Sequence, residues 1–324
     1  MWRDLLMTSN RLININKKGL EFTFAWLFAI IAGAVIIFIA IYATTQFIGT
    51  SKDASNAKIT GEVGSILESV ETSLEEGKQI KIEFPDETRI YNRCDDFGNF
   101  GRQLLSVSVR SGIGNEFQRS ENEQAFFDKY IFSEELVQGK EVNIFVKPFE
   151  MPYKIASLAY IYSENYCFVN PSGDIEDEIR GLNLKNVNIS ESVGGCARES
   201  IKVCFESAGC DVNVNLEEQS VTKNRIKVFY EGDSLMYGAI FAEPEIYLCQ
   251  VTRLMKRTGE LAHVYSLKAE FLEGKGCTTG LDNKMKIYAS NLANVESDKD
   301  DIKAIGIEST EIRRSNEKLS CKLF

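Results

Sequence analysis

FAWLFAIIAGAVIIFIAIYA, the stretch from Phe24 to Ala43, decides how the rest of this chain is organised. None of its 20 residues carries a charge. About 20 helical residues span the roughly 30 Å hydrocarbon core of a bilayer, and only a helix satisfies its own backbone hydrogen bonds there. Trp26 and Tyr42 lie near the two ends, where aromatic side chains suit the membrane interfaces. The stretch therefore predicts one transmembrane helix, placed within residues 20–48.

A cleaved secretory signal is the main alternative interpretation of this stretch. Such a signal has an apolar region of about 7–15 residues, followed by a small-x-small cleavage site. The apolar region here is longer, and Ile41-Tyr42-Ala43 is a poor cleavage site. The pattern favours an anchor that stays on the protein.

The charges on either side of the apolar segment predict its orientation. Residues 1–19 carry four basic side chains and only one acidic side chain, Asp4. The positive-inside rule therefore predicts a cytoplasmic leader at 1–19 and an extracytoplasmic location for the bulk of the chain. Beyond the segment, 33 Lys and Arg stand against 45 Asp and Glu, a net charge of −12. So acidic a domain repels nucleic acid and anionic headgroups, and neither is an expected partner of it. The anchor makes the membrane an expected partner, and further copies of the chain or other surface proteins are the others.

The boundary before the apolar segment reads Lys17-Lys18-Gly19-Leu20-Glu21-Phe22. A basic pair and a glycine at this place resemble the processing site of type IV pilin-like precursors, including archaeal class III signal peptides. The resemblance covers about the first 75 residues, and it implies cleavage between Gly19 and Leu20. The family usually carries a glutamate at the fifth mature position, whereas this chain has Glu21 at the second. The alternative is that the two lysines only fix the orientation of the anchor.

A second helical pattern follows the membrane segment, at residues 49–77. Apolar residues recur there at spacings of three and four: Ile59, Val63, Ile66, Leu67, Val70 and Leu74. This spacing predicts an amphipathic helix with one apolar stripe, and Gly77 is a plausible terminator. In pilin-like subunits such a stripe packs under a β-rich head.

The region 78–232 has the pattern of half-buried strands. Apolar and polar residues alternate in Ile80–Phe84, Leu105–Val109, Val142–Val146 and Ile226–Tyr230. We expect a mostly antiparallel β region here, with short helices at Glu121–Phe127 and Ile175–Leu182.

The region 233–324 has a helical pattern, which makes the predicted fold class α+β. Pro244 suits a first helical turn, and the apolar spacing then predicts a helix up to Gly274. A second stripe runs from Leu281 to Val295, and a third short helix would end near Leu319. We expect a packed helical pair or hairpin, with the basic cluster on the long helix forming a solvated face (Arg253, Lys256 and Arg257).

All eight cysteines lie beyond the anchor: Cys94, Cys167, Cys196, Cys204, Cys210, Cys249, Cys277 and Cys321. An even number on the extracytoplasmic side favours disulfides. Zinc-binding spacings are absent, because the sequence has no C-x-x-C and one histidine, His263. We interpret that histidine as a partly buried helical residue.

The expected helices restrict how the cysteines pair. Cys249 and Cys277 would lie about 40 Å apart on one helix, far beyond disulfide reach. Antiparallel helices would instead bring Cys321 back to Cys249, which is the bridge we prefer there. Cys204 and Cys210 flank a loop short enough to staple a hairpin.

The sequence marks no catalytic group, cofactor site or metal site. The acidic run Asp174, Glu176, Asp177 and Glu178 could bind calcium, but a solvated helix face explains it better. Asn188-Ile189-Ser190 is an N-glycosylation sequon, which has meaning only outside the cytoplasm.

Three functional hypotheses fit these patterns. The first is a non-enzymatic surface protein with a pilin-like anchor, serving structure or adhesion. The second is a monomeric membrane-tethered receptor or binding module. The third is an anchored hydrolase, which would need a deep pocket with convergent carboxylates of shifted pKa. The stretches Phe149–Tyr153 and Ala242–Tyr247 also resemble uncharacterised archaeal single-pass membrane proteins, a resemblance that implies no activity.

Overall fold

The computed structural model describes residues 24–73, 79–110, 117, 123–207, 209–293, 295 and 299–324. Its contacts divide the chain into two compact units, residues 1–52 and 53–324. Helix α1 (Phe24–Ser73) runs through the division, so its two parts are described separately, each with its own unit.

The second unit begins with the last part of α1, which packs on a six-stranded sheet. Val63 is 1 % exposed, and Ile59 and Ile66 lie beside it at helical spacing. Gly64 makes the contact close, because a Cβ atom at this position would lie 2.6 Å from the ring of Phe126. The amphipathic stripe of the sequence thus contacts a sheet.

This first sheet has the order β3 (Gln124–Phe126), β2 (Arg102–Val109), β1 (Gln79–Asp95), β5 (Leu136–Glu150), β6 (Lys154–Tyr162) and β4 (Tyr130–Phe132). Its neighbours pair antiparallel, except that β4 and β6 are parallel. The short helix predicted over Glu121–Phe127 is wrong where the structure describes it. Residues 124–126 pair with β2 as strand β3, so edge pairing prevails over the local pattern.

The two faces of the first sheet pack against different elements, because side chains alternate along each strand. Ile144 and Val146 of β5 belong to the core beneath α1, whereas Phe145 between them belongs to the larger core on the opposite face. Phe145 stacks on Tyr160 of β6, with ring centroids 4.4 Å apart. The sheet is therefore buried on both sides.

The second sheet has the order β12 (Ile226–Phe229), β11 (Ser220–Lys223), β10 (Val212–Asn215), β9 (Ile201–Phe205), β7 (Tyr166–Val169) and β8 (Val187–Ser190). Strands β8, β7, β9 and β10 run parallel, unlike the mostly antiparallel pairing expected from the sequence. Helix α2 (Gly173–Leu182) connects β7 to β8, and the short 3₁₀ helix η1 (Val193–Gly195) follows β8. The predicted helix near 175–182 corresponds to α2.

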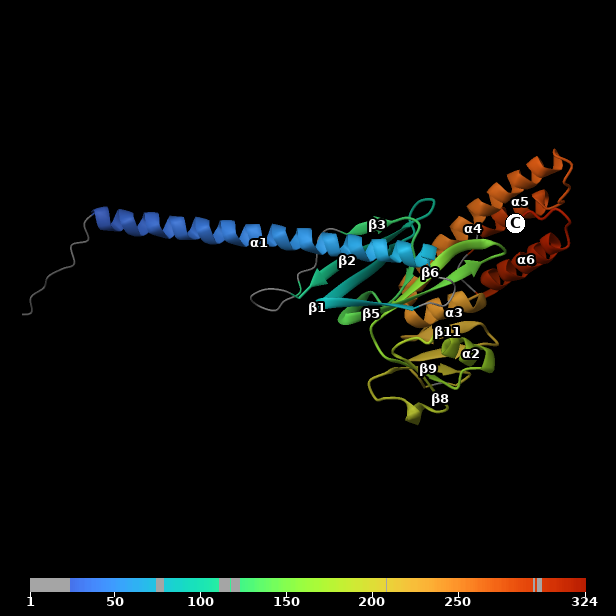
Figure 1. Ribbon diagram of the computed structural model, residues 1–324, viewed down its shortest axis with the longest axis horizontal. Coiled ribbons are helices and arrows are strands. Elements are labelled where there is room, and N and C mark those ends of the chain that lie inside the picture. The colour runs from blue at the N-terminus through green and yellow to red at the C-terminus, as the bar shows by residue number, and fades with distance from the viewer. Residues whose placement is uncertain are drawn as a thin grey trace, which may run out of the picture. The chain divides into compact units, whose positions relative to one another are not determined.

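Four helices complete the second unit: α3 (Gly232–Phe241), α4 (Pro244–Glu273), α5 (Asp282–Leu292) and α6 (Lys299–Glu317). Figure 1 shows the long helix α4 running beside α5, with α6 nearby. The residues of α3 from Leu235 to Phe241 are all buried, and Phe241 packs on Tyr166 of the second sheet and Phe145 of the first. One large core therefore joins both sheets and the C-terminal helices, across the boundary predicted at 232–233.

Candidate functional site

The apolar part of α1 is the one helix of the described residues long and apolar enough to cross a membrane. The span Trp26–Thr44 has 19 residues and a mean hydropathy of 2.6, and none of it is buried within the structure. Trp26 and Tyr42 are each 61 % exposed. The inferred cleavage site at Gly19 and Leu20 lies outside the described residues.

The eight cysteines lie in four pairs at disulfide distance: Cys94–Cys249, Cys167–Cys196, Cys204–Cys210 and Cys277–Cys321. The predicted Cys204–Cys210 pair is therefore present, and Cys249 and Cys277 belong to different bridges, as helix geometry requires. The predicted bridge between Cys249 and Cys321 is wrong. Cys249 lies near the start of α4, where β1 passes, whereas Cys321 returns to the far end of α4 beside Cys277.

Arg253 differs most from its predicted role as part of a solvated face. Its side chain is 0 % exposed. It donates hydrogen bonds to the main-chain oxygens of Phe100, Phe127 and Lys129, at 3.1, 3.2 and 2.9 Å. Its guanidinium also lies 4.7 Å from the ring centroid of Tyr130. Burial lowers the pKa of Arg253, and backbone carbonyls take the place of a carboxylate partner.

Arg253 and Lys256, one turn apart on α4, hold the loop between β1 and β2 against this helix. Lys256 Nζ donates to the main-chain oxygens of Asp96 and Gly98, at 2.6 and 3.1 Å. Phe97 lies between these two residues and is 89 % exposed. Two cations of the predicted basic cluster thus fix a loop.

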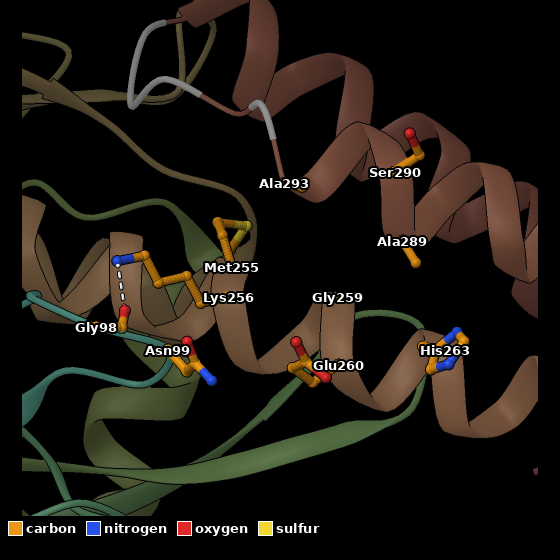
Figure 2. Close-up of a pocket in the computed structure, with 10 residues that line it drawn as sticks. All are labelled: Gly98, Asn99, Met255, Lys256, Gly259, Glu260, His263, Ala289, Ser290 and Ala293. Atoms are coloured by element: carbon orange, nitrogen blue, oxygen red, sulfur yellow. Dashed lines mark hydrogen bonds between the residues drawn. The ribbon is translucent and has the colours of Figure 1, made fainter.

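A pocket of about 530 Å³ lies beside that loop, between α4 and α5. Figure 2 shows Lys256, Glu260 and His263 in succession along one side of α4, with Asn99 from the loop and Ser290 from α5. His263 is exposed, so the prediction of a partly buried histidine is wrong. The lining brings a cation, a carboxylate and an imidazole to one surface, which suits a small polar ligand or a side chain of a partner.

A second group of titratable side chains lies where the two sheets meet the start of α4. Glu134, between β4 and β5, is hydrogen-bonded to Glu243 at the N-terminus of α4. Lys223 of β11 donates a hydrogen bond to Glu134 and further ones to the main-chain oxygens of Ile240 and Ala242, the last two at 3.3 and 3.0 Å. These contacts tie α3, α4 and both sheets together.

The carboxyl groups of Glu134 and Glu243 share one proton. Burial raises the pKa of Glu134 to about 7, and the hydrogen bond to Glu243 adds to the rise. That same hydrogen bond lowers the pKa of Glu243. Glu134 therefore holds the proton while Glu243 carries the charge. Glu243 also lines a pocket of about 460 Å³, with Glu135 and Glu245.

The remaining predicted site residues lie on the second sheet and α2. Glu176 of the acidic run pairs with Arg180, and Glu178 pairs with Lys147. Among the described residues, no three His, Cys, Asp or Glu side chains are placed to hold a metal ion. Asn188 is exposed on β8.

No protein-family model, curated protein or solved structure matches the chain.

Sequence reasoning did not identify the junction of Glu134, Glu243 and Lys223. Lys223 and Glu134 are 89 residues apart, and no local motif marks either of them. Only the packing of three elements brings them together.

Proposed function

We propose that this chain is a membrane-anchored, extracytoplasmic surface protein, a pilin-like structural or adhesion subunit. The continuity of α1 is the observation that carries the proposal. One helix contains both an apolar span, Trp26–Thr44, and a segment whose Val63 is buried against a β-sheet. An anchor that continues into the core of the head is the arrangement implied by the resemblance at Lys17–Phe22.

The four cysteine pairs support the extracytoplasmic part of the proposal. Disulfides form and persist in oxidising compartments and are rare in the cytosol. Each pair lies in the second unit, beyond the apolar span. The basic leader before the span supports the same orientation.

A monomeric membrane-tethered binding module is the second candidate function. The pocket beside Lys256 and His263 favours it, since its lining offers charged and neutral hydrogen-bonding groups on one surface. Filament formation separates the two candidates, because a binding module stays monomeric.

The Glu134–Glu243 pair is the observation that favours an anchored hydrolase. The pair combines a protonated and an ionised carboxyl group, as acid–base chemistry requires. However, Glu243 lines the adjacent pocket and Glu134 does not. Lys223 binds main-chain oxygens at the C-terminal end of α3 while it binds Glu134, so we assign the carboxyl pair to structure.

Membrane extraction combined with protease treatment tests the proposal. The full chain should stay with membranes through an alkaline carbonate wash, and protease added outside intact cells should digest its second unit. As a matched control, a variant with Ile36→Glu and Ile37→Arg places two charges at the centre of the span. Each charge there costs about 3 kcal/mol, so the variant should not stay in the membrane pellet.

Electron microscopy of the material sheared from these cells then distinguishes a filament subunit from a monomeric module. Filaments containing the chain would support the structural role. Recovery of the wild-type chain in the carbonate supernatant, or its full protection from external protease, would contradict the proposal.

A further inference from the structure

Strand β8 forms one edge of the second sheet, where Figure 1 shows it beyond β9. Within the described residues it pairs only with β7, from Val187 to Ser190. An edge strand presents unpaired backbone groups to other chains, and natural proteins protect such edges with charges, prolines or coverings.

The two edges of this sheet are protected differently. The opposite edge, β12, carries Lys227, whose ammonium pairs with Glu218 at 2.9 Å. Strand β8 reads Val-Asn-Ile-Ser, without a charge or a proline. Its protection must therefore come from something other than its own side-chain charges.

The alternation of side chains on β8 turns one residue outward. Val187 and Ile189 pack against the large core. Asn188 lies between them and is exposed on the other face of the sheet. In the parallel register Asn188 lies opposite Cys167, which is bridged to Cys196. The amide of Asn188 is thus accessible at an open edge.

Asn188-Ile189-Ser190 is the only N-x-[ST] sequence in the chain in which x is not proline. We propose that Asn188 carries an N-linked glycan, which covers the β8 edge. The proposal rests on the extracytoplasmic location proposed above, because the sequon has meaning only there.

The modification is a glycosyl transfer made by a membrane-bound enzyme of the exporting cell. The donor class is a glycan joined through phosphate to a lipid. Nδ2 of Asn188 forms a bond to the anomeric carbon of the glycan and loses a proton. The bond from that carbon to the phosphate breaks, and the lipid phosphate leaves with the electron pair. No oxidant or reductant is needed.

Asn170 provides an internal control. It is exposed like Asn188, and Ser172 follows it at the spacing of a sequon. Pro171 stands between them, and proline at this position excludes the sequon. Asn170 should therefore stay unmodified in the same molecules.

Trypsin produces a peptide pair that tests both the glycan and the location. Cleavage after Lys185 and Arg198 releases Asn186–Arg198, which contains Asn188 and Cys196. Cleavage after Lys154 and Arg180 releases Ile155–Arg180, which contains Asn170 and Cys167. Without reductant, the Cys167–Cys196 disulfide keeps the two peptides together.

Mass spectrometry of the full chain from exporting, N-glycosylating cells, alkylated before digestion, gives three distinguishable results. A linked pair with a glycan mass on Asn186–Arg198 alone supports the proposal. A linked pair of unmodified mass overturns the glycan while the extracytoplasmic location stands. Unlinked peptides with Cys196 alkylated overturn the location and the glycan together.

Three substitutions assign the glycan to the sequon. Asn188→Gln and Ser190→Ala should each remove the added mass completely, and Ser190→Thr should retain it because threonine preserves the sequon. An added mass that persists in Asn188→Gln would overturn the assignment.

The edge-covering role is tested by self-association. Unglycosylated Asn188→Gln should form oligomers at high protein concentration, and Asn188→Lys should stay monomeric because it places a charge on the edge. Equal association of the two variants in sedimentation would overturn that role.

Discussion

Cys94 of β1 and Cys249 of α4 are joined by a disulfide across 155 residues of sequence, with their Cα atoms 6.0 Å apart. It connects the first sheet to the first turns of the long helix. Arg253 lies one turn further along α4 and binds the main chain of the adjoining loops. Covalent and polar links therefore fasten α4 to the sheet at one place.

The size of the closed loop predicts which disulfide contributes most to stability. In the chain-entropy treatment, the Cys94–Cys249 bridge contributes about 5 kcal/mol and the Cys204–Cys210 bridge, which spans 6 residues, about 2 kcal/mol. We expect the double variant Cys94→Ala, Cys249→Ala to lose the larger free energy of unfolding in guanidinium titrations. An equal loss in Cys204→Ala, Cys210→Ala would contradict this ranking.

Replacing the buried guanidinium should destabilise the second unit strongly. Arg253→Met keeps much of the side-chain volume but leaves the main-chain oxygens of Phe100, Phe127 and Lys129 without these donors. Unsatisfied buried groups cost about 1–3 kcal/mol each, and because two of the three oxygens are only partly buried we expect a loss in the lower part of that summed range, about 3–5 kcal/mol. Lys256→Met is the matched control. Its two main-chain bonds are solvent-exposed, and about 1 kcal/mol is expected. Similar losses in the two variants would show that Arg253 has no special role.

The carboxyl pair predicts a specific pH dependence of stability. The ordinary pKa of 4.5 for Glu134 is raised to about 7 in the folded chain. Between these values the folded state holds a proton that the unfolded state has lost, so the free energy of unfolding falls as pH rises, by at most about 1.4 kcal/mol per pH unit. The lowered pKa of Glu243 has the opposite effect, because it makes the free energy of unfolding rise with pH. This effect is confined to pH values below about 4.5.

Glu134→Gln removes this titration while its amide still donates to Glu243. Urea unfolding at pH 5 and pH 8 should therefore show a smaller loss of stability in the variant than in the wild type. Glu135→Gln changes the exposed neighbour and should behave like the wild type. An equal loss of stability between pH 5 and pH 8 in Glu134→Gln and in the wild type would contradict the shared proton.

Two glycines of α1 should respond to alanine with opposite signs. A Cβ atom at Gly64 would lie 2.6 Å from the ring of Phe126, whereas at Gly61 the nearest atom, of Gln124, is 3.8 Å away. Gly61→Ala should stabilise the helix by about 0.5–1 kcal/mol, and Gly64→Ala should destabilise the fold by about 1–3 kcal/mol. Thermal unfolding of the two variants measures the difference. Stabilisation by both substitutions would mean that α1 does not pack closely on β3.

The elements with a regular period could be predicted from the sequence. The apolar span follows from an uninterrupted run of uncharged residues, and the stripe around Val63 and the long helix from Pro244 follow from apolar spacing within one element. The spacing of apolar residues indicates which side of a helix is buried, so helices with a regular apolar period can be predicted.

Features that depend on packing between distant elements could not be predicted. Cys249 forms its disulfide with Cys94, so this bridge depends on where β1 lies. Cys321 forms its disulfide with Cys277 and not with Cys249. Arg253 belongs in the sequence to a basic cluster with Lys256 and Arg257, yet two loops from the sheet cover it. A basic side chain on a long helix gives no local sign of burial by a loop more than a hundred residues away.

The intact mass of the membrane-extracted chain, alkylated before and after reduction, tests the central claim most directly. A membrane-anchored protein with an extracytoplasmic head should retain every residue from Leu20 onward, with no thiol alkylated before reduction and eight alkylated after it. A chain that begins beyond Ala43, or cysteines that are alkylated without reduction, would contradict a membrane-anchored protein with an extracytoplasmic head.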